Sequence, residues 1–196
     1  SEITSLIRVG SFPKIGLSIE KSVLEKVFKG KQLIKHYQIK TGVNFLSYRN
    51  AGGRYYKVVL DFEPDFKING ELKPSSTYQR IYFKDKKISS SIGGVMNSSL
   101  FFWYWLIFSD TWHMLNREIG SFPVDLNEYL KTKLSILNKK LMQDILNNSI
   151  LRRENRNKGK DIVEFMMFNV RESKPIIDEI DCVLAEHYGF TQEELD

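Results

Sequence analysis

Hydrophobic and polar positions along the chain change their spacing several times, and each spacing predicts a kind of element. Residues 17–29 place apolar side chains three or four positions apart with charged ones between them, which predicts an amphipathic helix ended by Gly30. From residue 33 to about residue 83, short runs of Tyr, Phe, Val and Ile alternate with turn signals, which predicts strands. Two pairs that tolerate positive φ are the expected tight turns, Gly52-Gly53 and Asn69-Gly70.

The most apolar segment of the chain is LFFWYWLIF, residues 100–108. A helix needs about 20 apolar residues to cross a membrane, so this segment is too short for that. Because it is apolar on every side, we expect a helix inside the fold. Asn97 or Ser98 is the expected N-cap, since either side chain can accept a hydrogen bond from the first turn.

The last third of the chain has the most regular pattern. Leucine and isoleucine recur every three to five positions over residues 124–151, which predicts one long helix, or two broken near Asn147-Asn148. Residues 152–161, RRENRNKGKD, are polar throughout and indicate an exposed loop or linker. A final helical region is marked by cap and stop signals, which are Ser173, Pro175 and Gly189 for one helix and a Thr191/Glu194 capping box for another.

Together these elements predict an α+β fold. We expect a mixed, strand-rich body with a buried aromatic helix in residues 1–123, and a helical C-terminal part, residues 124–196, packed on it. Cys182 is the single cysteine, so an internal disulfide is impossible and a reducing cytoplasm is the expected location. A start at Ser1 rather than Met suggests a fragment of a longer polypeptide.

The net charge of +5 is unevenly distributed. Residues 1–160 carry 27 basic and 14 acidic side chains, whereas residues 161–196 carry two and ten. A polyanion such as DNA would be attracted to the first part and repelled by the second, which is expected to face away. The alternative is that the lysines serve only solubility.

Sequence motifs for cofactor chemistry are missing. Three histidines and one cysteine give no zinc spacing, and neither a Gly-x-Gly loop nor a P-loop occurs. We therefore expect no cofactor and no small-molecule substrate for this chain. One catalytic alternative stays open, a Mg²⁺-dependent endonuclease in which two carboxylates hold the metal and a lysine assists the attacking water, with the residues Asp65, Asp85 and Lys87.

Residues suited to reading DNA cluster in YRNAGGRYYK. Arginine and asparagine make bidentate contacts to guanine and adenine, and tyrosines can stack or contact phosphates. The candidates there are Arg49, Asn50, Arg54, Tyr55, Tyr56 and Lys57. Lysines of the KDKK segment would contact phosphates only, and these are Lys84, Lys86 and Lys87. The alternative is a hairpin whose tyrosines are half buried and whose arginines are solvated.

Four blocks, in order, resemble the region that follows the catalytic domain in adenine-specific DNA methyltransferases, especially type II restriction-modification enzymes that join both activities in one polypeptide. They are FPKIGLSIEKSVLEKV, YRNAGGRYYKVVLDF, NSSLFFWYWLIFSDTWHMLNREIGSFPVD and SKPIIDEIDCVLAEHYGFTQEELD. The Asn-Pro-Pro-Tyr series and S-adenosylmethionine loop of the catalytic domain do not occur here. The resemblance therefore implies a non-catalytic target-recognition (specificity) domain.

That resemblance implies duplex DNA and the catalytic methyltransferase domain of the same polypeptide as partners, with S-adenosylmethionine bound by that other domain. It also implies a DNA-facing loop after the aromatic helix, with Ser109, Asp110, His113, Asn116 and Arg117 at the polar positions. The alternative for Asp110 and His113 is that they bond each other or cap helix ends. Trp112 departs from the small residue expected between them. A third function class is an interaction module that uses the leucine-rich helix.

Overall fold

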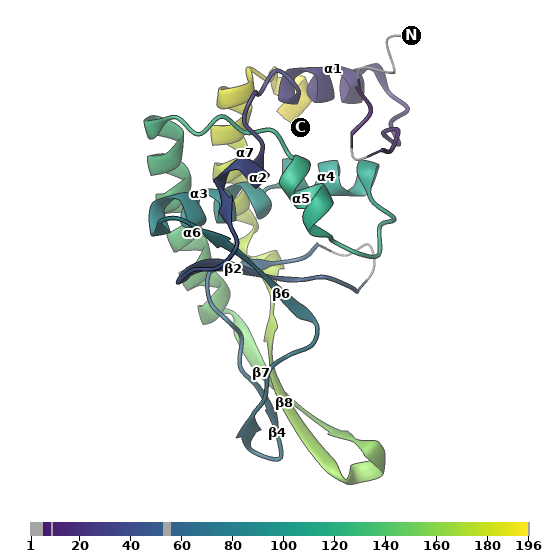
Figure 1. The fold of residues 1–196 in the computed structure, drawn as a ribbon, viewed down its shortest axis with the longest axis vertical. Helices are drawn as coiled ribbons and strands as arrows, with labels where there is room; N and C mark the ends of the chain where they lie inside the picture. Colours follow the sequence, from purple (N-terminus) through teal and green to yellow (C-terminus); the bar gives the residue numbers. More distant parts are fainter. Residues whose placement is uncertain (1–5, 9, 53–55, 196) are drawn as a thin grey trace.

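A computed structural model of the chain describes residues 6–8, 10–52 and 56–195 (Figure 1). The fold is α+β, with most helices gathered at one end of the molecule and two separate antiparallel sheets toward the other. This confirms the fold class expected from the sequence. Arg54 and Tyr55, two of the predicted DNA contacts, lie outside the described residues, as does Gly53 of one predicted turn.

The order of elements is α1 (Ser18–Val27), α2 (Ile34–Tyr37), β1 (Gln38–Ile39), β2 (Asn44–Arg49), β3 (Val59–Leu60), β4 (Phe66–Ile68), β5 (Glu71–Leu72), β6 (Tyr78–Phe83), α3 (Lys86–Met96), α4 (Ser99–Phe108), α5 (Asn116–Ser121), α6 (Glu128–Asn147), β7 (Ser149–Arg156), β8 (Asp161–Phe168), α7 (Lys174–Tyr188) and α8 (Gln192–Leu195). The helix predicted over residues 17–29 is α1. The strands predicted between residues 33 and 83 are β1 to β6, preceded by the short α2.

The first sheet has the strand order β1-β6-β2-β3. Its longest pairing joins β2 to β6 from Asn44↔Phe83 to Arg49↔Tyr78. One face of this sheet packs on α3, and Asn97 at the end of α3 holds β3 in place: its Oδ1 accepts from the Val59 amide at 2.9 Å, and its Nδ2 donates to the Val59 carbonyl at 2.8 Å. An amide side chain therefore completes the backbone hydrogen bonding of this edge strand.

The second sheet, with the order β5-β4-β8-β7, corrects the sequence interpretation. The segment 152–161, expected to be a linker, forms most of β7 and the turn of a long hairpin with β8, paired from Ser149↔Phe168 to Arg156↔Asp161. Asn157 and Lys158 take positive φ in that turn. Composition misled here because the pairing partners that turn polar residues into a strand lie outside the segment.

The predicted Asn69-Gly70 turn is present, with φ of 52° and 83°, and it joins β4 to β5. The turn lies against the hairpin, because the Asn69 Oδ1 accepts from the Ile162 amide at 2.8 Å. β4 then pairs with β8 from Phe66↔Phe165 to Ile68↔Val163. Residues on both sides of the predicted boundary at residue 123 thus share one sheet, and the part after it is not wholly helical.

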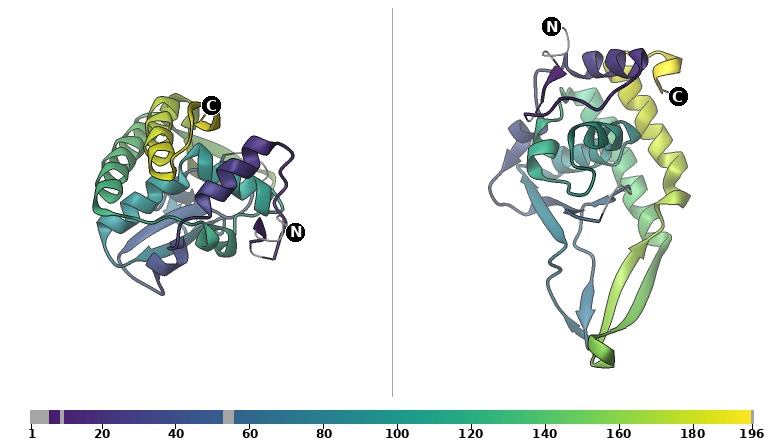
Figure 2. Two further views of the ribbon diagram at one scale, coloured as in Figure 1. Left: turned by 90° about the horizontal axis from the view of Figure 1, so that it is seen from above. Right: turned by 90° about the vertical axis from the view of Figure 1, so that its right-hand side faces the viewer.

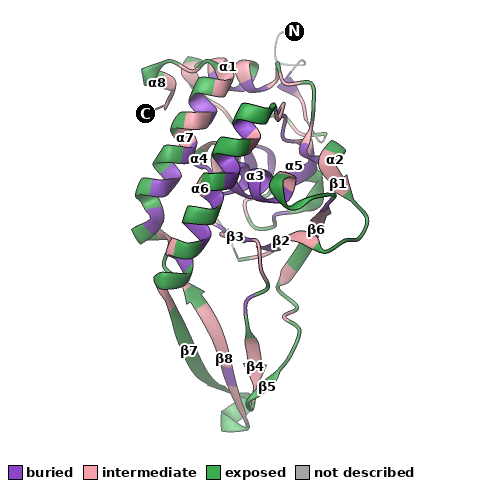
Figure 3. Cartoon of the chain, turned by 90° about the vertical axis from the view of Figure 1, so that its left-hand side faces the viewer, coloured by how far each residue is buried: buried purple, intermediate pink, exposed green. Residues whose placement is uncertain are grey.

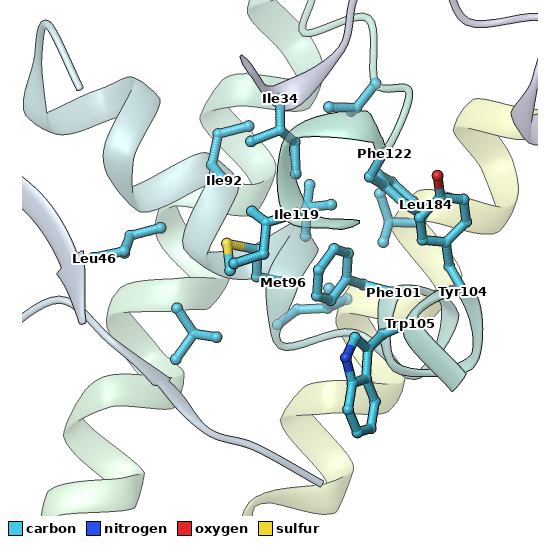
Figure 4. Packing of buried hydrophobic residues seen from close by; sticks show 14 of the residues in the cluster. Ile34, Leu46, Ile92, Met96, Phe101, Tyr104, Trp105, Ile119, Phe122 and Leu184 are labelled. Atoms are coloured by element: carbon cyan, nitrogen blue, oxygen red, sulfur yellow. The ribbon is translucent and has the colours of Figure 1, made fainter. Parts of the chain in front are cut away.

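Helix α4 carries the centre of the core, as its apolar sequence predicted (Figure 4). Ser98 is its N-cap and accepts from the Phe101 amide at 3.0 Å. Phe101, Tyr104 and Trp105 are fully buried, whereas Leu100 keeps partial exposure, so the burial is less complete than expected. The Tyr104 hydroxyl is satisfied by a hydrogen bond with the Ser121 hydroxyl at 2.8 Å. No helix in the described part of the chain is both long and apolar enough to cross a membrane.

Helices α3 and α6 approach closely because α3 presents glycines at the contact. A Cβ on Gly93 would lie 2.9 Å from the side chain of Asn138, and one on Gly94 would lie 3.2 Å from the Leu134 carbonyl oxygen. α6 ends at Asn147, the predicted break, and the chain enters β7 two residues later. The long helix expected from the leucine pattern is therefore one helix of 20 residues.

Two of the predicted C-terminal signals, the Gly189 stop and the Thr191/Glu194 capping box, are present in the structure. Gly189 ends α7 in the left-handed conformation at φ 70°, and the Thr191 amide donates to the Glu194 carboxylate at 2.7 Å in the expected capping box. Ser173 is the N-cap residue of α7, but its hydroxyl donates to the Asp144 carboxylate at 2.7 Å instead of capping. Both termini lie at the helical end, far from the tip of the β7–β8 hairpin (Figures 1 and 2).

Candidate nucleic-acid interface

An open groove of about 720 Å³ lies between the two sheets. One wall consists of the end of β2 and the segments after β2 and before β6, and the other consists of β4 and β8 (Figure 2, right). Aromatic rings line much of it, and the charged side chains at its surface are three basic ones and one acidic one: Arg49, Lys57, Arg156 and Asp65. The groove is therefore aromatic with a net positive lining.

Arg49 and Asn50 lie at the end of β2, and the structure fixes their backbone. The Asn50 amide donates to the Thr77 carbonyl at 3.1 Å, and the Asn50 carbonyl accepts from the Met114 amide at 2.9 Å. Arg49 is exposed and lines the groove, as a DNA-contacting residue requires. Among the described residues of the YRNAGGRYYK motif, Arg49 is the one whose exposed side chain best fits the predicted role.

Tyr56 is half buried, as the structural alternative in the sequence analysis expected. Its ring packs on Phe102 with centroids 5.4 Å apart, and its hydroxyl donates to the Asn97 carbonyl. Burial, followed by the charge of Asp181, raises the pKa of Tyr56 far above its ordinary value. The Tyr56 hydroxyl therefore already has a partner inside the fold, while its partly buried side chain also lines the groove.

Lys57 is the most unusual residue of the groove wall. It is 7% exposed, and its ammonium lies 3.8 Å from the centroid of the buried Trp105 ring. Burial lowers the pKa of Lys57 to about 8, with a further lowering by Arg49 and an opposing contribution from Asp110. A partly desolvated ammonium of this kind interacts strongly with an anion that enters the groove.

The loop between α4 and α5, residues 109–115, lies beside that wall (Figure 2, right). It is attached to the rest of the fold by several hydrogen bonds: the Lys14 ammonium donates to the Ser109 carbonyl, the Trp105 Nε1 donates to the His113 carbonyl at 2.9 Å, and the Met114 amide donates to the Asn50 carbonyl. Ser109 is buried, and its hydroxyl accepts from the Thr111 amide at 3.0 Å. The predicted DNA contact of Ser109 is therefore not available in this conformation.

Asp110 and His113 form the pair that the structural alternative anticipated. The Asp110 Oδ2 lies 2.8 Å from the His113 Nδ1, and its Oδ1 accepts from the amides of Trp112 and His113 at 2.8 and 2.7 Å. These hydrogen bonds, with the His113 side chain first, lower the pKa of Asp110 to about 2. His113 is nevertheless exposed, so fixing the loop leaves its ring accessible.

Asn116 and Arg117 open α5 on the same surface, and both are exposed. The Asn116 Oδ1 accepts from the Gln38 Nε2 at 2.9 Å, and the Arg117 guanidinium pairs with the buried carboxylate of Glu118 at 2.5 Å. The hydrogen bond between Met114 and Asn50 thus places the loop with His113 beside Arg49, whereas Asn116 contacts Gln38, whose partner Phe83 pairs with the other end of β2.

The lysines of the KDKK segment lie elsewhere. Lys84 follows Phe83, which pairs with Asn44 at the far end of β2 from Arg49, a separation of about 17 Å for five steps along a strand. Lys86 pairs with Asp61 at 2.8 Å and Lys87 with Glu128 at 3.1 Å. The prediction of one DNA surface that includes these lysines is not supported by this arrangement.

The residues of the endonuclease alternative have separate surroundings. Asp65 lines the groove, whereas Asp85 is the N-cap of α3 and accepts from the Ile88 amide at 2.8 Å. Lys87 turns to Glu128 on α6. Over the described ranges, no three His, Cys, Asp or Glu side chains are grouped so that they could hold a metal ion. No feature of the described part of the chain favours this alternative, which stays a prediction.

The β7–β8 hairpin is a basic element whose strand structure the sequence analysis did not predict. It carries five basic and three acidic side chains, and seven of the eight β7 residues are exposed (Figure 3). Its basic residues are Arg152, Arg153, Arg156, Lys158 and Lys160. The sequence placed these positions in a linker or exposed loop, where they could have no fixed relation to Arg49.

A comparison of the chain with protein-family models, curated proteins and solved structures finds no match.

Proposed function

We propose that this chain recognises duplex DNA, as the non-catalytic specificity domain of a restriction-modification methyltransferase. The observation that carries the proposal is the position of two exposed basic elements on either side of the aromatic groove. One is the end of β2 with Arg49, beside the loop that carries His113, and the other is the β7–β8 hairpin. An opening between two basic walls favours a polyanion.

The groove itself has the volume of a small-ligand pocket and cannot enclose a duplex. The duplex would instead lie across its opening, with the hairpin in a DNA groove. Strands of eight residues, at about 3.4 Å per residue, give a ribbon about 27 Å long. Because β8 also pairs with β4, the part of this sheet that would enter the major groove, which is about 12 Å wide, is its exposed outer strand β7.

The register of the hairpin separates its side chains into two faces. Arg152 and Arg156 pair with Phe165 and Asp161, and so share the face of the groove-lining Phe165. Arg153 lies on the opposite face. We propose that the first two arginines read base edges or phosphates, because they point to the side on which Arg49 lies. Arg156 already lies 5.9 Å from the Phe165 ring centroid, which limits its conformations.

The acidic C-terminal helices fit the same orientation. Residues 174–195 hold six acidic and one basic side chain, and α7 runs away from the hairpin to the opposite end of the molecule (Figure 1). A duplex bound at the hairpin would therefore be distant from most of the acidic charge. The catalytic methyltransferase domain of the same polypeptide is the proposed second partner, and it would bind S-adenosylmethionine.

The test is a fluorescence-anisotropy titration of labelled, pooled 20-base-pair duplexes of random sequence, because the recognised bases are unknown. We expect the logarithm of the association constant to fall linearly with the logarithm of salt concentration between about 50 and 200 mM. The double variant Arg152→Ala/Arg156→Ala should bind more weakly and reduce the slope by about 2.

A matched control removes the same charge at the helical end. Lys133→Ala/Lys139→Ala alters two exposed lysines of α6 and should keep the slope within about 0.5 of the original, since these positions lie outside the proposed interface. Equal losses in both double variants would mean that net charge alone attracts DNA. No salt-dependent binding in the original chain would refute the proposal.

A further inference from the structure

Trp112 differs from the other two tryptophans of the chain. Trp105 is fully buried, and Trp103 is partly buried with its Nε1 3.5 Å from the Glu20 carboxylate. Trp112 is 57% exposed in the loop between α4 and α5. A large exposed aromatic side chain lacks the stabilisation that burial would give, and a binding partner that covers the ring would supply it.

The backbone beneath Trp112 is fixed in an unfavourable conformation. Thr111 has φ of 63°, in the left-handed region that a β-branched residue rarely adopts. Hydrogen bonds hold it there: the Thr111 amide donates to the Ser109 hydroxyl, and the Trp112 amide donates to the Asp110 carboxylate. Such strain persists only where the surroundings impose it, and it is concentrated at functional sites.

The C-terminal part of the loop is also attached to the body of the protein. The His113 carbonyl accepts from the Trp105 indole at 2.9 Å, and the Met114 amide donates to the Asn50 carbonyl at 2.9 Å. Trp105 belongs to the core and Asn50 follows β2, so Trp112 is held at a defined position relative to Arg49. A rigid loop of this kind loses little entropy when its exposed ring makes a contact.

Exposed charged side chains flank Trp112 in the sequence. His113 follows it directly and pairs with Asp110 at 2.8 Å, and Arg117 pairs with the buried carboxylate of Glu118. The side chain of Arg117 is nevertheless 60% exposed. Leu115, 41% exposed, is a large apolar side chain of the same loop. An exposed ring near an exposed guanidinium fits a ligand that combines a flat π-surface with negative charge, which is the chemistry of nucleic acid.

We propose that Trp112 is a base-stacking residue of the DNA interface, whose indole inserts against an unstacked base while the neighbouring cations bind the flanking phosphates. The inference rests on the proposed function and adds a contact to it. Apolar wedges that insert at a base step separate the stacked bases, and the energy of unstacking is smaller where the duplex is already mismatched. An apolar contact with a protein domain is the competing use of Trp112, and the polar neighbours favour DNA.

The experiment compares two pools of labelled duplexes that differ only in one central mismatched pair. The original chain should bind the mismatched pool several-fold more tightly than the matched pool. Trp112→Ala should lose about tenfold in affinity and lose the preference for mismatches, because stacking on a base contributes about 5- to 150-fold. Trp112→Phe, which keeps an aromatic ring, should recover most of both.

Controls separate stacking from misfolding and from a general effect of aromatic side chains. Tyr129→Ala removes another exposed ring, 56% exposed on α6, and should bind both pools like the original chain. Thermal melting of Trp112→Ala should match the original, since the indole is mostly exposed. DNA should quench tryptophan fluorescence in the original chain and not in Trp112→Phe, whose remaining tryptophans are at least partly buried.

The outcomes distinguish this inference from the proposed function. If the original chain binds neither pool in a salt-dependent way, the proposed function fails and the inference fails with it. If it binds both pools, and Trp112→Ala binds them with unchanged affinity and preference, Trp112 is not a stacking residue and a protein contact becomes its use. DNA recognition would then stand without this contact.

Discussion

Replacing Lys57 by methionine tests whether the buried ammonium of Lys57 destabilises the folded state. Methionine keeps an unbranched side chain over the Trp105 ring and removes the ammonium. Burial lowers the pKa of Lys57 from 10.5 to about 8, and each pKa unit corresponds to about 1.4 kcal/mol, so the charged form destabilises the folded state by about 3 kcal/mol. Loss of the cation–π contact offsets about 1 kcal/mol of the gain.

The expected result is that Lys57→Met is more stable than the original chain at pH 7, by about 1 to 3 kcal/mol. Below pH 8 both the folded and the unfolded chain hold the proton, so the full penalty is present. Between pH 8 and 10.5 the unfolded chain binds more protons, so the stability of the original chain rises with pH and approaches that of the variant. Urea denaturation at several pH values from 7 to about 10 measures both effects.

Two results would refute this reasoning about Lys57. One is a variant that is less stable at pH 7, which would mean that the ammonium contributes net stability. The other is a difference between the two proteins that stays constant from pH 7 to about 10, which would mean that the pKa is not lowered. If the groove binds DNA, the stabilised variant should also bind pooled duplexes more weakly, and most clearly below pH 8, where Lys57 is charged.

Two further predictions concern the packing that supports the interface. Asn97→Ala should destabilise the fold by about 2 to 4 kcal/mol in a denaturation experiment, because it leaves the buried amide and carbonyl of Val59 without partners. A loss below about 0.5 kcal/mol would show that these groups of β3 find other hydrogen-bond partners. Gly93→Ala should destabilise the folded state by about 1 to 3 kcal/mol despite the better helix propensity of alanine, because the new Cβ would lie 2.9 Å from the Asn138 side chain. An increase in the melting temperature would contradict this close contact.

The sequence alone predicted the parts of the structure that depend on neighbouring residues. Ser98 caps α4, Gly189 ends α7, and the Asn69-Gly70 pair makes its turn, because capping and left-handed conformations are settled within a few residues. The apolar run 100–108 predicted a buried helix, because a helix that is apolar on all sides is stable only inside a fold. The α+β class followed from these local patterns.

The candidate site, by contrast, could be predicted only in part. Arg49 lies exposed in the groove, and His113 lies exposed in the loop that is bonded to the end of β2. Tyr56 and Ser109 belong to the same motifs, but their hydroxyl groups have partners inside the fold. A motif specifies which residue types are present, whereas burial and hydrogen-bond partners depend on chain segments that lie far away in the sequence.

Tertiary structure alone decided the role of the basic segment 152–161. Its composition is that of a linker, yet it forms a fixed ribbon because β8 pairs with β7 on one side and with β4 on the other, as in Phe66↔Phe165. Strand pairing between residues nearly a hundred positions apart leaves no local periodic signal in either segment. The groove exists only because that pairing joins the two halves of the chain, so its position and charge became visible with the fold.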